Sequence, residues 1–207
     1  EARAGDARPM RNVYVDGFWI DRMEVSNAEY DRFTSATGHA PRRKPPQHFR
    51  DMDKPEHPVS GVTWHDAMDF AAWSGKRLPT EAEWEKAARG TDGREYPWGA
   101  EPRSGMRVVN VGTDSVLVGL HDVFPLTAPV LEFPAGASPY GLRNMAGNVA
   151  EWCSDWYAAD AYAGAPDRNP QGAAIGTHRV VRGGHWHSPL DDVRTWKRGR
   201  WSHSAAG

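Results

Sequence analysis

The sequence has little of three things that often reveal a function: cysteine, excess charge and long hydrophobic runs. One cysteine among 207 residues cannot form an internal disulfide. A formal net charge of -2 lacks the basic surface of a nucleic-acid-binding domain, so no nucleic-acid partner is expected. No uncharged apolar run is long enough to span a membrane, so no membrane span is expected. Residues 1–11 contain no signal peptide, which leaves both export and a cytoplasmic location open.

Glycine, proline and tryptophan are abundant instead. The chain has 21 Gly, 16 Pro and 10 Trp, while 39% hydrophobic residues suffice for a core. Gly and Pro favour turns, so this composition predicts a loop-dominated fold anchored by aromatic side chains. Because no disulfide can hold the loops, a bound metal ion is the first candidate to do so.

The regular elements predict an α+β fold with short helices in the N-terminal half. Ser26 and Thr80 each open a capping box, and Thr63 can cap a helix between them. The predicted helices span residues 26–38, 63–75 and 80–90, and each ends at a glycine. Alternating apolar residues predict a strand at 13–18, with further strand material at 108–109, 130–131 and 179–182.

The segment 140–152 could carry a cation site. Asn144 and Glu151 offer side-chain oxygens, and the turn between them presents backbone carbonyls. Hard cations such as Ca²⁺ bind this mixture of ligands. The alternative is a plain turn in which Asn and Gly take left-handed conformations, and spacing alone favours the turn.

A second group is rich in histidine. His185 and His187 would share one face of a strand, which allows a transition-metal site, but no complete zinc spacing occurs. Arg194 and Arg198 lie among tryptophans and could bind an anionic ligand or simply form salt bridges. Cys153 stands in an aromatic stretch, which favours a buried, inert thiol.

These features together resemble the formylglycine-generating-enzyme family, also called sulfatase-modifying-factor proteins. The matching motifs span almost the whole sequence. They are Val-Asp-Gly-Phe-Trp-Ile-Asp at 15–21, Glu-Val-Ser-Asn at 24–27, His-Pro-Val at 57–59, Val-Thr-Trp-His-Asp-Ala at 62–67, Gly-Lys-Arg-Leu-Pro-Thr-Glu-Ala-Glu-Trp-Glu at 75–85, Tyr-Pro-Trp-Gly at 96–99, Gly-Leu to Trp at 141–152 and Arg-Val-Val-Arg-Gly-Gly at 179–184.

The resemblance implies the family's variant of the C-type lectin fold, with two calcium sites. The first would use the side chains of Asn110 and Asp122 with the carbonyls of Val111 and Phe124. The second would use the side chains of Asn144 and Glu151 with the carbonyls of Gly147 and Val149. On this basis the cation reading replaces the plain turn.

The resemblance fails at the family's copper site. Its oxidases bind copper through two cysteines shortly after a Gly-Gly-Ser motif, and these positions fall here on Ser188 and Val193, after Gly183-Gly184-His185. Soft Cu(I) needs thiolates. The sequence therefore predicts no copper and no formylglycine formation by the copper mechanism; any other transition metal is left open.

Three functions remain for such a chain. It could be an enzyme with a remodelled pocket built on His185, His187 and Ser188, a noncatalytic binding domain, or an accessory protein. A binding domain could resemble the variable proteins of diversity-generating retroelements, which display residues at about 185–203. The expected ligand is a peptide, a protein or a small molecule in a groove, bound by a monomer. Candidate contact residues are Trp186, Asp191, Asp192, Arg194, Trp196, Arg198 and Trp201.

The domain organisation follows from the same comparison. Residues 1–207 are expected to form one domain of this family. The family's terminal strands, one ending in Met-Gly-Ser and one containing Gly-Phe-Arg, are not found in these residues, and we expect them to be missing from the given sequence.

Overall fold

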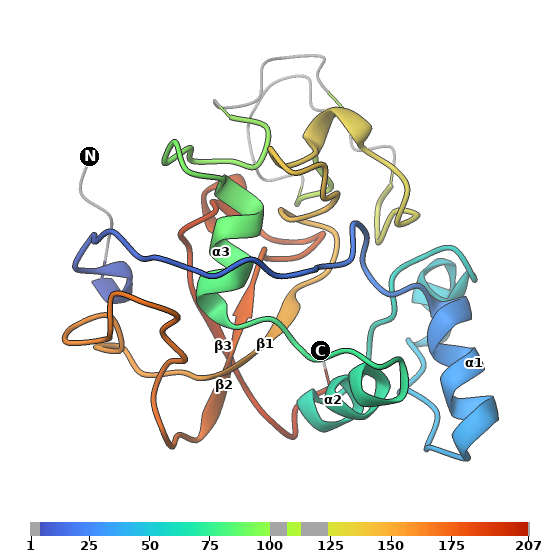
Figure 1. Cartoon of the computed structure of the whole chain (residues 1–207). Coiled ribbons are helices and arrows are strands. Elements are labelled where there is room, and N and C mark those ends of the chain that lie inside the picture. Colours follow the sequence, from blue (N-terminus) through green and yellow to red (C-terminus); the bar gives the residue numbers. More distant parts are fainter. Residues whose placement is uncertain (1–4, 100–106, 113–123, 207) are drawn as a thin grey trace.

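The computed structural model describes residues 5–99, 107–112 and 124–206, and combines short helices with a small sheet (Figure 1). The α-helices are α1 (Asn27–Thr37), α2 (Trp64–Trp73) and α3 (Glu81–Arg89). The strands are β1 (Glu151–Trp156), β2 (His178–Arg182) and β3 (Gly199–Ser202). Short 3-10 helices are η1 (Gly5–Ala7), η2 (Gln47–Asp53), η3 (Pro134–Gly136) and η4 (Leu190–Val193). The predicted α+β class is confirmed.

All three α-helices begin where their caps predict. Ser26, Thr63 and Thr80 each accept a hydrogen bond from the backbone N–H three residues later, and each capping box is complete. Helix α1 ends at Gly38 with φ 72°, a left-handed conformation that suits glycine. The sequence therefore predicts these elements from local chemistry alone.

The sheet has the order β1-β2-β3, and both pairs are antiparallel. Helix α3 lies across it (Figure 1) and buries Trp84 completely. Trp84 belongs to a core cluster that includes Leu142, Cys153 and Val180. This packing fixes the start of β1, where Glu151 stands, against α3.

A buried ionic network ties the sheet to α3. The Arg182 side chain is fully buried and donates to Glu81 at 3.0 Å, to Glu85 at 2.9 Å and to the Thr195 carbonyl at 2.6 Å. Arg198 donates to both carboxylate oxygens of Glu81, at 2.8 and 2.9 Å. Each buried charge has opposite charges beside it, which is the condition for ions to be tolerated in a core.

Helices α1 and α2 pack against each other, and α2 also contacts the sheet through Trp64, which clusters with Trp152 and Val181 (Figure 1). Their contact is aromatic: Tyr30 stacks on Phe70 with ring centroids 5.9 Å apart, and Phe33 meets Phe70 edge-on at 5.7 Å. The aromatic cluster between α1 and α2 is distinct from the cluster under α3, while a third cluster joins α2 to the sheet.

The predicted strand at 13–18 is wrong, although its side-chain pattern is that of a strand. Val15 is buried, Gly17 and Trp19 are exposed, and Phe18 and Ile20 pack partly buried on the core. Only Tyr14 forms a bridge, with Arg168. A strand needs a partner for its backbone groups, and none lies along residues 17–21 in the described structure. Residues 108–109 and 130–131 also form no strand, whereas 179–182 lies in β2 as predicted.

Within the residues that the structure describes, none of the helices has the length and hydrophobicity to cross a membrane.

Candidate functional site

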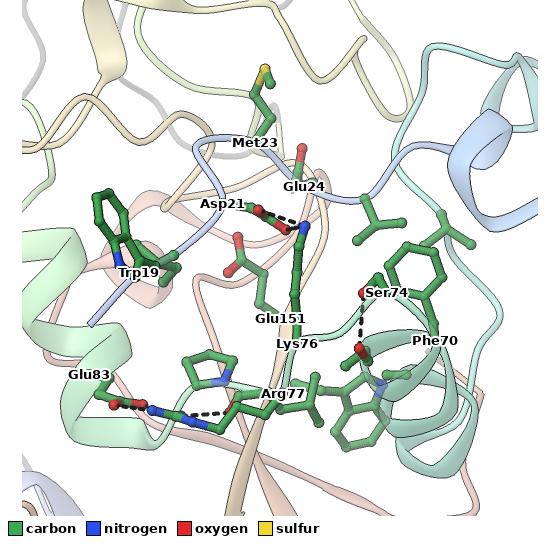
Figure 2. A pocket seen from close by; sticks show the side chains of 18 of the residues that line it. Trp19, Asp21, Met23, Glu24, Phe70, Ser74, Lys76, Arg77, Glu83 and Glu151 are labelled. Carbon is green, nitrogen blue, oxygen red and sulfur yellow. Dashed lines mark hydrogen bonds and ion pairs between the residues drawn. The ribbon is translucent and has the colours of Figure 1, made fainter. Parts of the chain in front are cut away.

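A slot lies between the aromatic cluster of α1 and α2 and the core cluster under α3. We use this name for the cavity of about 650 Å³ bordered by residues 17–25, 74–79 and 143–152 and by the inner face of α2 (Figure 2). Its interior is largely apolar, with Val62, Phe70, Leu78, Met145 and Trp152 among its walls. The volume lies within the range of about 300–1,000 Å³ that ligand pockets occupy.

Two ion pairs mark the rim of the slot (Figure 2). Lys76 donates to Asp21 at 2.8 Å, and Arg77 donates to both oxygens of Glu83 at 2.7 Å. Trp19 stands fully exposed beside them. An indole with its whole surface in water is a candidate contact for a ligand that enters the slot.

Two carboxylates, Glu24 and Glu151, point into the slot (Figure 2). Trp84 donates its indole N–H to Glu151 at 2.7 Å, yet burial raises the pKa of Glu151 to about 7. Burial, and then the charge of Glu151, raise the pKa of Glu24 well above its ordinary value. The electrostatics of this pair favour a positive charge beside it.

Glu24 is the site residue that sequence reasoning missed. It accepts hydrogen bonds from the Asn144 and Asn148 amides, each at 2.8 Å, and from the Val149 backbone N–H at 3.3 Å. Glu24 stands 120 residues before Asn144, so spacing could not connect them. The matching Glu-Val-Ser-Asn motif was the one signal that pointed to it.

The extended segment 17–21 forms one wall of the slot, and its backbone is unpaired. The backbone hydrogen bonds of the described structure include none from or to these five residues. The neighbouring Arg22 carbonyl accepts from the Arg143 N–H at 2.8 Å, which holds the end of the segment in place. The slot therefore has a wall that offers free N–H and C=O groups, as an edge strand does.

The first predicted calcium group is partly described. Asn110 is 1% exposed and donates its amide to the Leu126 carbonyl at 2.7 Å, while its side-chain oxygen is buried without a hydrogen-bond partner. Val111, the next residue in the sequence, is also buried, and the Phe124 ring packs against the Phe133 ring. Asp122 lies outside the described residues. A buried, unpartnered oxygen fits a cation ligand, because burial without any partner is costly.

The second predicted calcium group forms a tight turn before β1. Asn144, Gly147 and Asn148 have φ values of 57°, 72° and 62°, the left-handed conformations expected for these residue types. The Gly147 N–H donates to the Gly183 carbonyl, and the Val149 N–H reaches Glu24. The Asn144 amide donates to Glu24, and the charge of Glu151 acts on Glu24, so two carboxylates supply oxygen ligands of the kind that a hard cation prefers. Among the described residues, no three His, Cys, Asp or Glu side chains group closely enough to hold a metal by themselves.

The loop after Gly183-Gly184 does not fit copper. A Cβ atom at Gly184 would lie 2.7 Å from Val193 Cγ1 and 3.2 Å from Ser188 Oγ, so both side chains lie next to Gly184. Val193 is fully buried, and the Ser188 hydroxyl accepts from the His185 N–H at 3.1 Å. A methyl group and an engaged hydroxyl provide no soft donor for Cu(I).

The three predicted catalytic residues lie together but bond to their own loop. His185 Nδ1 accepts from the His187 N–H at 3.2 Å, and the Ser188 N–H donates to the His185 carbonyl. Burial, and then His187, lower the pKa of His185. No hydrogen bond joins the Ser188 hydroxyl to an imidazole in this described loop, so a nucleophile–base pair is not assembled.

The predicted contact residues bond to different neighbours in the described part of the chain, and none of them lines the slot. Asp191 pairs with Arg194 at 2.9 Å, and Asp192 with Lys197 at 2.9 Å. The others point to different neighbours: Trp186 contacts Phe49, Trp196 donates to Glu95, Arg198 binds Glu81 and Trp201 packs on Trp152. Their ligand-binding role stays a prediction.

Cys153 is fully buried in the core beside Trp84. Burial, and then the charge of Asp155, raise the pKa of its thiol well above the ordinary value. A thiol that neither ionises nor meets solvent is inert, as the sequence predicts.

Known proteins resemble this chain over most of its length. The formylglycine-generating enzyme of Thermomonospora curvata is 38% identical over 224 residues, covering 85% of this chain and 73% of that protein. The serine/threonine-protein kinase pkn1 of Chlamydia caviae is 36% identical over 213 residues, and the hercynine oxygenase of Mycolicibacterium thermoresistibile is 34% identical over 234 residues. The match covers 94% of this chain and 32% of the kinase, and 95% of this chain and 50% of the oxygenase.

Solved structures share the fold. PvdO from Pseudomonas aeruginosa superposes with a TM-score of 0.72 at 26% identity, covering 90% of this chain and 75% of that one. Treponema denticola variable protein 1 superposes with a TM-score of 0.66 at 24% identity, covering 89% and 78%. The family model described as "Sulfatase-modifying factor enzyme 1-like domain" matches residues 1–207. The chain therefore belongs to this sulfatase-modifying-factor family, but it lacks the family's pair of copper-binding cysteines, because its one cysteine is Cys153 in the core.

Proposed function

We propose that this chain is a calcium-stabilised binding domain whose slot receives an extended peptide as an added strand. The unpaired wall at residues 17–21 carries the proposal. A small molecule could fill a cavity of this volume, but only a peptide backbone can use a row of free N–H and C=O groups. Strand addition to an exposed edge is a common mode of peptide recognition.

The interior of the slot supports an apolar side chain on that peptide. Side chains alternate along a strand, so every second one would point inward. Inward positions would meet Phe70, Leu78 and Trp152, while the exposed Trp19 could cover the peptide from the rim. The Gly-Phe-Arg sequence that the resemblance predicts for a terminal strand has one large apolar and one basic residue, and so makes a suitable probe.

Calcium would hold the floor of the slot. The proposed ligands of one ion are Asn144, Glu151 and the carbonyls of Gly147 and Val149, with Glu24 added; those of the other are Asn110, Asp122, Val111 and Phe124. Ca²⁺ would neutralise the facing carboxylates of Glu24 and Glu151 and fix the two loops. Catalysis through copper forms no part of the proposal, because Ser188 and Val193 supply no thiolate.

Calcium binding is tested by chelation. Removing calcium with EGTA should lower the melting temperature, because a ligand held only by the folded state stabilises it by mass action. Calcium at 100 times its Kd corresponds to about 2.7 kcal/mol, and hence to roughly 5 °C or more for a chain of this size. In Glu24→Gln the chelator should have a smaller effect. An unchanged melt, with no calcium in elemental analysis, would rule out the ion.

Strand addition is tested with a labelled nine-residue peptide that has Gly-Phe-Arg at its centre. Fluorescence polarisation in calcium buffer should show saturable binding to the domain. Replacing the peptide's Phe by Asp should abolish binding, since an unpaired charge would enter an apolar wall.

A protein variant that fills the slot provides the matched control. Ser74 lines the slot and is half-buried, so Ser74→Phe should block the peptide, and the circular dichroism spectrum should remain that of the folded domain. Ala36 is exposed on α1, and Ala36→Phe adds the same bulk without affecting binding. Equal affinities for the two variants would contradict binding in the slot.

A further inference from the structure

A pair of histidines that does not line the slot forms a second candidate site. His65 is the second residue of α2, and His203 directly follows β3. The His65 Nε2 and His203 Nδ1 atoms lie 3.3 Å apart, although 138 residues separate them in sequence. His65 is exposed and His203 partly exposed, so solvent ions can reach both rings.

An aromatic frame holds the two rings in place. His65 packs edge-on against Trp64 with ring centroids 5.2 Å apart, and His203 packs edge-on against Trp156 at 5.8 Å. The Arg179 guanidinium lies between the two tryptophans, 3.7 Å from the Trp64 ring and 3.5 Å from the Trp156 ring. These five side chains close a ring of contacts, which restricts both imidazoles before any ligand binds.

The backbone adds a further restraint. The Trp64 N–H donates to the His203 carbonyl at 3.3 Å, which joins the start of α2 to the end of β3. The histidine rings are nearly perpendicular, at 88°. The ring nitrogens that face each other therefore sit on two elements that are already connected.

The separation of these nitrogens matches a metal chelate. Two Zn–N bonds of the usual length at a tetrahedral angle place the nitrogens about 3.3 to 3.4 Å apart. In the metal-free protein the same contact is a hydrogen bond between the two imidazoles, which a metal ion would replace. The observed 3.3 Å corresponds to one edge of a metal tetrahedron.

We propose that His65 and His203 bind a divalent transition metal ion that clips the end of β3 to α2. Imidazole nitrogen suits Zn²⁺, Ni²⁺ and Cu²⁺, whereas Ca²⁺ and Mg²⁺ prefer oxygen. No third His, Cys, Asp or Glu joins the pair among the described residues, so water completes the coordination. This site uses none of the slot or calcium residues and stands apart from the proposed function.

The test uses untagged protein in calcium buffer at pH 7.5, titrated with Zn²⁺, Ni²⁺ and Cu²⁺ in separate calorimetric experiments. Cu²⁺ should bind most tightly, following the usual order of affinity. The spin-resonance spectrum of the bound Cu²⁺ should show two equatorial nitrogens from imidazole. His65→Gln and His203→Gln should each weaken binding about tenfold or more and reduce the signal to one nitrogen, as expected when a ligand is lost.

Two control variants identify the site. His187→Gln removes the alternative pair in the loop after Gly184, and His178→Gln changes a histidine at the start of the adjacent strand β2. Both should bind metal as the unmodified protein does. The proposal is overturned if no metal binds at millimolar concentration, if His187→Gln abolishes binding, or if both His65→Gln and His203→Gln leave it unchanged.

Discussion

Replacing Gly147 by Ala should destabilise the fold far more than its backbone conformation alone would require. Gly147 has φ 72°, where an L-residue is strained by about 1–2 kcal/mol. Its side chain would also overlap the Asn110 carbonyl oxygen and lie 2.9 Å from the carbonyl carbon. Moving that carbonyl would break its hydrogen bond from the Asn148 N–H, at 2.9 Å, and leave buried groups unpaired at about 1–3 kcal/mol. The sum is about 2–5 kcal/mol.

Gly141→Ala is the matched control. Gly141 has φ 81°, but a methyl group there would meet only the flexible Arg22 side chain at 3.6 Å. Its cost should be the conformational one alone, about 1–2 kcal/mol. Urea unfolding followed by circular dichroism measures the free energy that each variant loses. In a thermal melt, Gly147→Ala should lower the melting temperature by roughly 4 °C or more. If the two variants lose the same free energy, the two loops do not approach each other as described.

Two further predictions concern buried charge and pH. Arg182→Met removes a fully buried charge that Glu81, Glu85 and the Thr195 carbonyl all bind; Arg198 and Arg89 still pair with the two carboxylates, so the cost should be at most about 3–5 kcal/mol. Arg107→Met removes an exposed pair and should cost less than about 1 kcal/mol, and similar losses for the two variants would refute the network's role. Burial lowers the pKa of His57, whose Nδ1 lies 2.9 Å from the Thr127 hydroxyl. The unfolded state then binds the proton more readily, so the contribution of neutral His57 is present above about pH 6.5 and is lost as pH falls below it, by up to about 1.4 kcal/mol per pH unit. Melting curves of His57→Gln should lack this part of the pH dependence, and an identical slope would count against it.

Local chemistry explains which parts of the fold the sequence could predict. A capping box needs only four consecutive residues, so Ser26 and Thr80 place the starts of two helices correctly. Side-chain alternation at 13–18 also reflects real burial, but a strand requires a partner elsewhere in the chain. The same limit applied at Glu151, where the sequence predicted no strand, and β1 begins there because Arg182 pairs with it.

The candidate site also has one part that the sequence predicts and another that only the structure reveals. The family motifs name Asn144 and Glu151, and the structure adds Glu24 from a segment 120 residues earlier. The predicted loop at 185–203 contains the expected polar residues, but their partners within the fold could not be read from spacing. The slot could not be predicted either, because segments that are distant in the sequence form its walls.

Hydrogen exchange at the backbone N–H groups of residues 17–21 tests the central claim most directly. The domain is measured in calcium buffer with and without a saturating amount of the Gly-Phe-Arg peptide. Strand addition predicts fast exchange in the free domain and, on binding, slowed exchange at alternate residues of this segment, because an edge strand pairs with its partner through every second residue. Exchange that is already slow without peptide, or unchanged at saturation, would contradict the account.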